Sequence, residues 1–168
     1  MKILYVIIMM LFLGMVSCSE DNLKGYSSSN YIQFDKLSKD STVFSFAYDE
    51  TLESGTVALK LVMISPLVDR DRKYNVKFLQ DESSAQAGVD FEMPAEEQVI
   101  AANDSVAYLN VIVKRNKALK GSAIAVFEVQ ASDDFMPGIE ANRKGRIFIT
   151  NQLTRPGWWN DWHEANGL

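Results

Sequence analysis

The sequence has few of the side chains that most often perform catalysis or bind transition metals. It contains one cysteine, Cys18, and one histidine, His163, among 168 residues. One cysteine cannot form an internal disulfide, so the domain must rely on its core for stability. The same count excludes a zinc site of cysteine and histidine ligands. A Ser-His-Asp triad would need His163 to fold back onto the domain, so we expect a surface or packing residue there.

Basic residues are too few for a typical nucleic-acid-binding protein. Lysine and arginine number 17 against 22 acidic residues, which gives a formal net charge of −5 at pH 7. Such a chain would repel a phosphate backbone, so we expect no nucleic-acid partner. The charge also argues against electrostatic docking on anionic lipids. We expect no cofactor and no metal site.

The longest apolar run lies at the N terminus. Lys2 precedes a nearly unbroken apolar segment from Ile3 to Val16, followed by Ser17 and Cys18. A positive start, a short apolar segment and a small residue before the cleavage point are typical of a secretory signal. The run is shorter than the ~20 residues that cross a bilayer, which disfavours a permanent span. A buried helix or an uncleaved anchor is the alternative.

The end of this segment, Met15-Val16-Ser17-Cys18, resembles a bacterial lipobox, with methionine where leucine is usual. The resemblance implies that residues 1–17 are removed and that Cys18 becomes the lipid-modified first residue. The next residues, Ser19 to Asn22, resemble the acidic signal that sends some Bacteroidota lipoproteins to the cell surface; a solvated spacer is the alternative. The expected location is therefore the outer membrane, with the protein anchored by acyl chains at the cell surface.

The rest of the chain predicts a tether followed by one all-β domain. Residues 18–30 predict a flexible tether because they contain glycine and a run of serines. Residues 31–152 alternate apolar and polar side chains with period two and are punctuated by turn-forming clusters, without a helical period. We therefore predict an immunoglobulin-like antiparallel β-sandwich of seven to eight strands. The expected strands are 31–34, 43–48, 56–64, 73–79, 99–100, 106–113, 123–131 and 146–150.

The alternation also predicts the side chains that face the core. They are Phe44, Phe46, Tyr48, Val57, Leu59, Leu61, Met63, Tyr74, Val76, Phe78, Phe127, Val129, Ala131, Ile147 and Ile149. A tight turn at residues 102–105 predicts that strands 99–100 and 106–113 pair as a hairpin.

One loop and several scattered motifs suggest relatives. Ala85-Gln86-Ala87-Gly88-Val89-Asp90-Phe91 resembles the loop of Calx-beta-type sandwiches, where a small residue, a glycine and Asp-Phe or Asp-Tyr precede a strand. More of the chain resembles an uncharacterised Bacteroidota family of small surface lipoproteins of unknown function. The shared features are the lipobox, the Asp69–Arg72 turn, the loop above, Lys114-Arg115 and Pro156-Gly157-Trp158-Trp159. This resemblance implies an accessory protein of SusC/SusD-like uptake systems, and a truncated tail at residues 153–168.

Acidic loops are the main candidates for chemistry. Three carboxylate pairs could hydrolyse a glycosidic bond: Asp69 with Asp71, Asp90 with Glu92, and Asp133 with Asp134. Solvated loop residues are the favoured interpretation, since any acidic surface offers such pairs. A calcium site at Asp90 and Glu92 is the alternative, but Lys114 and Arg115 would repel the ion. We expect Gly88 to adopt a positive φ and Asp90 to close its loop by bonding nearby amides.

Two segments are candidates for binding. Trp158, Trp159 and Trp162 are all the tryptophans of the chain, and indole rings stack on sugar faces and dominate protein interfaces. The favoured alternative is that they cover an open end or edge of the sandwich. The Asp69–Arg72 turn is either a docking turn or, the favoured interpretation, a self-neutralising solvated loop.

The sequence therefore predicts a lipid-anchored, exported and non-catalytic β-sandwich. It would act as an accessory interaction module at the outer membrane, with an envelope protein complex as its partner. Polysaccharide binding through the three tryptophans is the alternative, and a small hydrolase is the second alternative.

Overall fold

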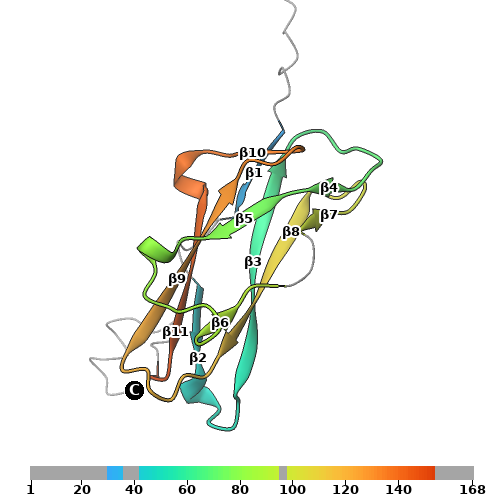
Figure 1. Ribbon diagram of the computed structural model, residues 1–168. Helices are drawn as coiled ribbons and strands as arrows, with labels where there is room; N and C mark the ends of the chain where they lie inside the picture. Colours follow the sequence, from blue (N-terminus) through green and yellow to red (C-terminus); the bar gives the residue numbers. More distant parts are fainter. Residues whose placement is uncertain (1–29, 36–41, 95–97, 154–168) are drawn as a thin grey trace, which may run out of the picture.

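The computed structural model describes residues 30–35, 42–94 and 98–153, which form a two-layer β-sandwich (Figure 1). Five strands form one sheet in the order β10-β1-β3-β8-β6, and four form the other in the order β2-β11-β9-β5. A two-stranded sheet pairs β4 with β7. Among the described residues, no helix is long and apolar enough to span a membrane.

The strands of the five-stranded sheet are β1 (Tyr31–Phe34), β3 (Ser54–Ile64), β6 (Phe91–Glu92), β8 (Val106–Lys114) and β10 (Met136–Pro137). Those of the four-stranded sheet are β2 (Thr42–Ser45), β5 (Asn75–Phe78), β9 (Ser122–Gln130) and β11 (Lys144–Thr150). The remaining strands are β4 (Arg72–Lys73) and β7 (Val99–Ile100), and the short 3-10 turns are η1 (Phe46–Tyr48), η2 (Gln80–Glu82) and η3 (Glu140–Asn142).

The predicted all-β sandwich is confirmed, and its longest strands follow the predicted alternation. In β3 every second residue from Val57 to Met63 is buried, and β8 runs antiparallel to it with Leu59 opposite Leu109. Most strand pairs are antiparallel, but β1–β10 and β2–β11 are parallel. The first two strands therefore belong to different sheets: β1 pairs with β3 in the five-stranded sheet, and β2 pairs with β11 in the four-stranded sheet.

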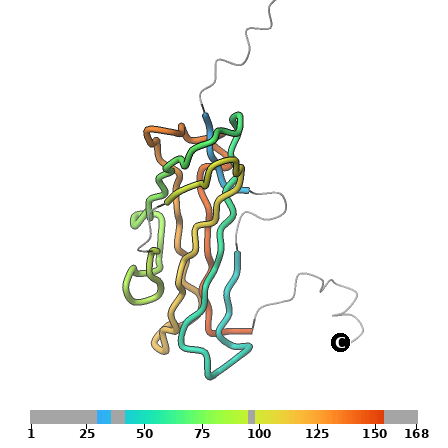
Figure 2. The backbone as a smooth tube through the Cα atoms, turned by 90° about the vertical axis from the view of Figure 1, so that its right-hand side faces the viewer, coloured from blue at the N-terminus to red at the C-terminus, as the bar shows by residue number. Residues whose placement is uncertain are grey.

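The core lies between the two sheets and is rich in aromatic rings. Phe127 lies 5.6 Å from Phe91 and 5.9 Å from Phe78 between ring centroids, and Phe91 meets Phe78 at 4.8 Å. Edge-to-face contacts of this kind add to the free energy gained from burying the rings. The described chain enters beside β1 at one end of the sandwich, and β11 finishes at the opposite end (Figure 2).

The predicted hairpin of residues 99–100 with 106–113 is wrong. The turn exists, since the Asp104 amide donates to the Ala101 carbonyl at 3.1 Å and Asn103 has a φ of 60°. Yet β8 pairs with β3 along one edge and with β6 on the other. Strand β7 instead pairs with β4.

Three further details differ from the prediction. Strand 43–48 ends at Ser45, whose hydroxyl accepts from the Ala47 amide at 3.2 Å, and the η1 turn then exposes Tyr48 instead of burying it. Strand 73–79 is split into β4 and β5, although Tyr74 between them remains buried. Strand β9 ends one residue before Ala131, which is exposed.

Candidate functional site

The candidate site is the end of the sandwich where the described chain begins. We define this loop end as residues 65–71, 101–105 and 131–135, which surround Asn30. The Asn30 side chain donates to the Asp134 carbonyl at 3.2 Å, and its own carbonyl accepts from the Met136 amide at 2.8 Å. The start of β1 is therefore bonded directly into the loop end.

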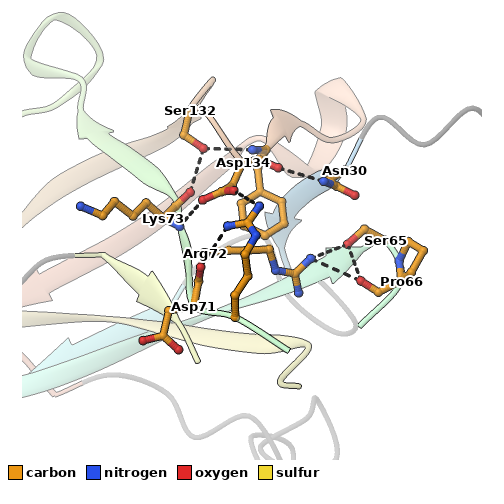
Figure 3. A network of polar contacts seen from close by, with 10 residues as sticks. Asn30, Ser65, Pro66, Asp71, Arg72, Lys73, Ser132 and Asp134 are labelled. Atoms are coloured by element: carbon orange, nitrogen blue, oxygen red, sulfur yellow. Dashed lines mark hydrogen bonds and ion pairs between the residues drawn. The ribbon is translucent and has the colours of Figure 1, made fainter. Parts of the chain in front are cut away.

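Arg72 lies at the centre of the loop end and joins its loops (Figure 3). Its side chain is 1% exposed. The guanidinium donates to Ser65 Oγ at 2.9 Å, to the Pro66 carbonyl at 3.3 Å and to the Asp104 carbonyl at 3.4 Å. It also lies over the ring of Phe135, 5.0 Å from the centroid. One cation thus links residues that are distant in the sequence.

The environment of Arg72 disfavours its charge. Its Nε has no hydrogen-bond partner, and no carboxylate bonds it among the residues that the structure describes. Burial, first, and the neighbouring Arg70 lower the pKa of Arg72, against an opposing effect of the Asp134 charge. The residue therefore acts through packing and through its bonds to neutral acceptors, and not through an ion pair.

A second network surrounds Asp134. One carboxylate oxygen accepts from Arg70 at 2.6 Å and the other from the Lys73 amide at 2.8 Å. The Ser132 hydroxyl donates to the Lys73 carbonyl at 2.9 Å and accepts from the Phe135 amide at 3.1 Å. The bond from Arg70, first, and that from the Lys73 amide hold the pKa of Asp134 below its ordinary value against the opposing effect of burial.

This lowered pKa predicts a dependence of stability on pH. Because the carboxylate is favoured in the folded state, it stabilises the fold above about pH 4, and that stability is lost as the pH falls through the lowered folded pKa. Between about pH 5 and pH 2 the wild type should therefore lose more of its free energy of unfolding than Asp134→Asn. Urea denaturation across this range measures the loss. The exposed neighbour is the control: Asp133→Asn should follow the wild type, and equal pH curves for all three proteins would contradict the assignment.

The Asp69–Arg72 turn is the solvated loop that the sequence favoured only in part: Asp69, Arg70 and Asp71 are exposed, but Arg72 is buried and the side-chain charges bond partners outside the turn. Asp71 accepts from the Ala102 amide at 2.9 Å and Asp69 from the side chain of Asn103 at 3.1 Å, so both carboxylates bind the 101–105 loop. Arg72 is buried because the rest of the loop end closes over it. The turn leaves one large apolar side chain exposed before it, Leu67, at 56%.

At the opposite end of the sandwich, Arg115 has a similar structural role. Its Nε donates to the Leu52 carbonyl at 2.6 Å, and its Nη2 donates to the Phe46 carbonyl at 2.7 Å and to the Asp49 carbonyl. The guanidinium also lies 4.9 Å from the centroid of the Phe46 ring. Arg115 therefore organises the segment between β2 and β3.

The loop of residues 85–91 behaves as predicted. Gly88 has a φ of +84°, a conformation that favours glycine. Asp90 is buried, with one carboxylate oxygen accepting from the Gln86 amide at 2.8 Å and the other from the Asn116 side chain at 2.8 Å. Glu92 is exposed and pairs instead with Lys114. The carboxylates of Asp90 and Glu92 therefore bond different residues and do not form a shared site.

We expect Asp90→Ala to lower the free energy of unfolding by about 2–3 kcal/mol, because two donors lose a buried acceptor. Asn116→Ala should cost about 1 kcal/mol, and the double variant should cost less than the sum, since both remove the same bond. Chemical denaturation of the four proteins measures the coupling. Glu92→Ala is the control and should change stability by under about 0.5 kcal/mol. Strict additivity of Asp90 and Asn116 would contradict the bond.

Among the described residues, the other carboxylate pairs that the sequence suggested do not converge on a common site. Asp69 and Asp71 bond different partners, and Asp134 is paired while Asp133 is exposed. No group of three or more histidine, cysteine, aspartate or glutamate side chains could hold a metal ion in the described part of the chain. Cys18, His163 and the segment with Trp158, Trp159 and Trp162 lie outside the described residues.

The structural roles of Arg72 and Arg115 were not predicted from the sequence. A signal for Arg72 was present: it is in phase with Tyr74 and Val76, which alternate toward the core. An arginine at a strand position that faces the core indicates a buried guanidinium that needs hydrogen-bond acceptors, but the pattern does not say which residues supply them. For Arg115 no such signal exists, because its acceptors lie more than sixty positions earlier in the chain.

Comparisons with known proteins give a family and a fold. A family model described as "Domain of unknown function (DUF4843)" matches residues 25–168. None of the curated proteins matches the sequence. Among solved structures, the apo form of the Calx CBD1 domain is similar with a TM-score of 0.52 at 8% identity, covering 75% of this chain and 100% of that domain. The Calx-beta resemblance is thus confirmed for the fold.

Two solved Bacteroides proteins are also similar. A "putative carbohydrate binding protein" from Bacteroides ovatus aligns with a TM-score of 0.52 and 12% identity, over 73% of this chain and 37% of that one. A two-domain protein of unknown function from Bacteroides fragilis aligns with a TM-score of 0.52 and 8% identity, over 74% of this chain and 46% of that one. At such identities the likeness concerns the fold alone.

Proposed function

This chain belongs to the DUF4843 family of domains of unknown function, and on that premise we propose that it is a non-catalytic accessory module of the outer membrane. It is anchored by lipid on Cys18 and docks an envelope protein complex, of the SusC/SusD-like kind, through its loop end. The observation that carries the proposal is the pre-organised loop end. Its loops are tied to one another through Arg72, Asp71 and Asp134 while Leu67 stays exposed.

Pre-organisation favours a binding role. A loop that is already ordered loses little conformational entropy when a partner binds, so more of its contact energy appears as affinity. Loops held by a stable scaffold are also the usual place for binding residues. The carboxylates of Asp69, Asp71 and Asp134 are already bonded within the chain, whereas Leu67 is exposed and can offer an apolar contact.

The proposed anchor places this end near the membrane. Asn30 begins the described domain beside the loop end. The segment from Cys18 to Asn30 reaches at most about 40 Å when fully extended. A partner in the same membrane is therefore within reach of the loop end, whereas the 114–121 loop at the far end points away from the point of attachment.

Two experiments test the proposal separately. For the anchor, Cys18→Ala should move the protein from the membrane to the soluble fraction, and unchanged retention would refute lipidation. For docking, Leu67→Asp should reduce recovery of the partner complex from solubilised membranes at least tenfold, because a charge would be placed in an apolar contact. Ala118→Asp, an equal charge change on an exposed residue of the opposite end, is the control. Equal recovery by both variants would refute docking through the loop end.

Polysaccharide binding is the second candidate function. It is supported by Trp158, Trp159 and Trp162 together with the fold shared with a "putative carbohydrate binding protein". Titration of tryptophan fluorescence with a panel of neutral and acidic polysaccharides tests it. A saturable change that Trp158→Ala removes would support this function, and no response across the panel would eliminate it.

A further inference from the structure

The two outward faces of the sandwich differ in chemistry. The four-stranded sheet presents mostly charged and polar side chains to solvent, including Lys77, Glu128, Lys144 and Arg146, beside a short apolar row of Val43, Phe148 and Ile124. The five-stranded sheet presents a larger apolar cluster among polar residues such as Gln33, Lys60 and Asn110. We call this cluster the apolar sheet face and define it by Tyr31, Val62, Ile64, Val106, Tyr108 and Met136.

The register makes the apolar sheet face continuous. Tyr31 of β1 lies opposite Ile64 of β3 and also pairs with Met136 of β10. Toward the other edge, Val62 lies opposite Val106 of β8. Tyr108 is 54% exposed, Met136 50% and Ile64 47%. Scattered exposed apolar residues are normal, but a contiguous strip across four strands marks an interaction site.

The charges within this face neutralise one another. Lys60 lies opposite Tyr108 and forms an ion pair with Asp35 at 2.7 Å. At the far edge, Lys114 pairs with Glu92. The face is therefore close to neutral, although the whole chain carries a formal charge of −5. Depletion of unpaired charge with enrichment of tyrosine and methionine is typical of the centre of a protein–protein interface.

The dimensions of the face suit a small interface. The whole outward surface of this sheet, with the polar residues Thr56, Lys60 and Asn110 around the apolar sheet face, spans about 26 Å along β3 at ~3.3 Å per residue and about 19 Å across four strands. This gives a flat footprint of about 500 Å², hence about 1,000 Å² for two such faces together, near the lower limit of a specific interface. The area is thus compatible with a reversible dimer and is too small for an obligate one.

We propose that the apolar sheet face binds the same face of a second copy of this chain, forming a symmetric dimer. A flat, neutral and apolar sheet is complementary to itself, and two such sheets pack about 10 Å apart with their strands inclined by about 30°. Internal pairing of Lys60 with Asp35 keeps Lys60 from placing an unpaired charge in the contact. A polysaccharide suits the face less well, because aliphatic side chains outnumber rings on it. The proposal is independent of the proposed function and uses a different surface.

Crosslinking in membranes from cells that express the full chain tests the dimer. A bis-maleimide linker should convert Tyr108→Cys to a species of twice the chain mass. Lys77→Cys, on the outer face of the other sheet, should remain monomeric, as should the wild type with Cys18 alone. Equal crosslinking at both positions, no crosslinking at Tyr108→Cys, or an adduct with a different protein would overturn the proposal.

Sedimentation of the purified protein provides the second test. The wild type should associate to a dimer below about 100 μM, and Tyr108→Asp should weaken the association at least tenfold. The milder variant Ile64→Thr keeps a β-branched side chain in the strand and should weaken the association in the same direction, which controls for disruption of the strand by Tyr108→Asp. A wild type that stays monomeric at this concentration overturns the proposal. Sedimentation does not depend on lipidation of Cys18, so failure of the anchor would leave this second readout unchanged, and the two results can be told apart.

Discussion

Replacing Arg72 with alanine is expected to lower the free energy of unfolding by about 3 kcal/mol. The change removes a long side chain that is 1% exposed and packs on Phe135. It also leaves the acceptors at Ser65, Pro66 and Asp104 without their donor. The loss of packing should be the larger part, because two of the three bonds are long, at 3.3 and 3.4 Å. Urea denaturation followed by circular dichroism measures the effect.

Arg72→Met separates these two contributions. Methionine keeps most of the buried volume and its contact with Phe135, and it ends the cost of burying a cation that no carboxylate bonds among the described residues. We therefore expect Arg72→Met to cost only about 1 kcal/mol. Equal losses for the alanine and methionine variants would show that the hydrogen bonds dominate instead. A loss below about 0.5 kcal/mol in Arg72→Ala would contradict any central role for this residue.

Phe127→Ala should have the largest effect in the protein, about 4 kcal/mol. The ring is fully buried and meets both Phe91 and Phe78, which come from the five-stranded and the four-stranded sheet respectively. Its removal would leave a cavity between the sheets that the surrounding β-strands cannot close without losing their register. Equilibrium denaturation and the thermal midpoint should both report the loss.

Phe148 provides a matched control for this prediction. It has the same side chain on β11 but faces outward and is only half-buried. Phe148→Ala should therefore cost about 1–2 kcal/mol, well below Phe127→Ala. If the two variants lost the same stability, the assignment of the aromatic cluster as the centre of the core would be wrong.

The fold was predictable where the chain encodes it locally. Val57, Leu59, Leu61 and Met63 recur with period two, and all four are buried, although the other side of the strand is itself half apolar. Such a period defines which face of a strand is inside, whatever its partner. Gly88 and Asp90 were also predictable, because their roles depend on backbone conformation and on amides a few residues away.

Features that depend on distant partners were not predictable. A turn between β7 and β8 suggested a hairpin, but the choice of partner is made by β3, which occupies one edge of β8 over nine residue pairs. Tyr48 matched the strand period, yet Ser45 caps a 3-10 turn that rotates it outward. The loop end likewise depends on Arg72 meeting residues from three separate loops, which no local pattern specifies.

The candidate site therefore consists of residues that the sequence presented as solvated charges. In the folded chain these charges order loops, and the surfaces left for partners are apolar: Leu67 at the loop end and the apolar sheet face on the side. One surface is proposed to bind an envelope protein and the other a second copy. The two lie on different parts of the molecule, so a single chain could use both at once.

Site-specific photocrosslinking in living cells tests the docking proposal most directly. A benzophenone amino acid would replace Leu67 in one strain and Ala118, at the opposite end, in another. A single adduct of defined mass with an outer-membrane protein is expected from position 67 and none from position 118. No adduct at position 67, or the same adduct at both positions, would contradict it.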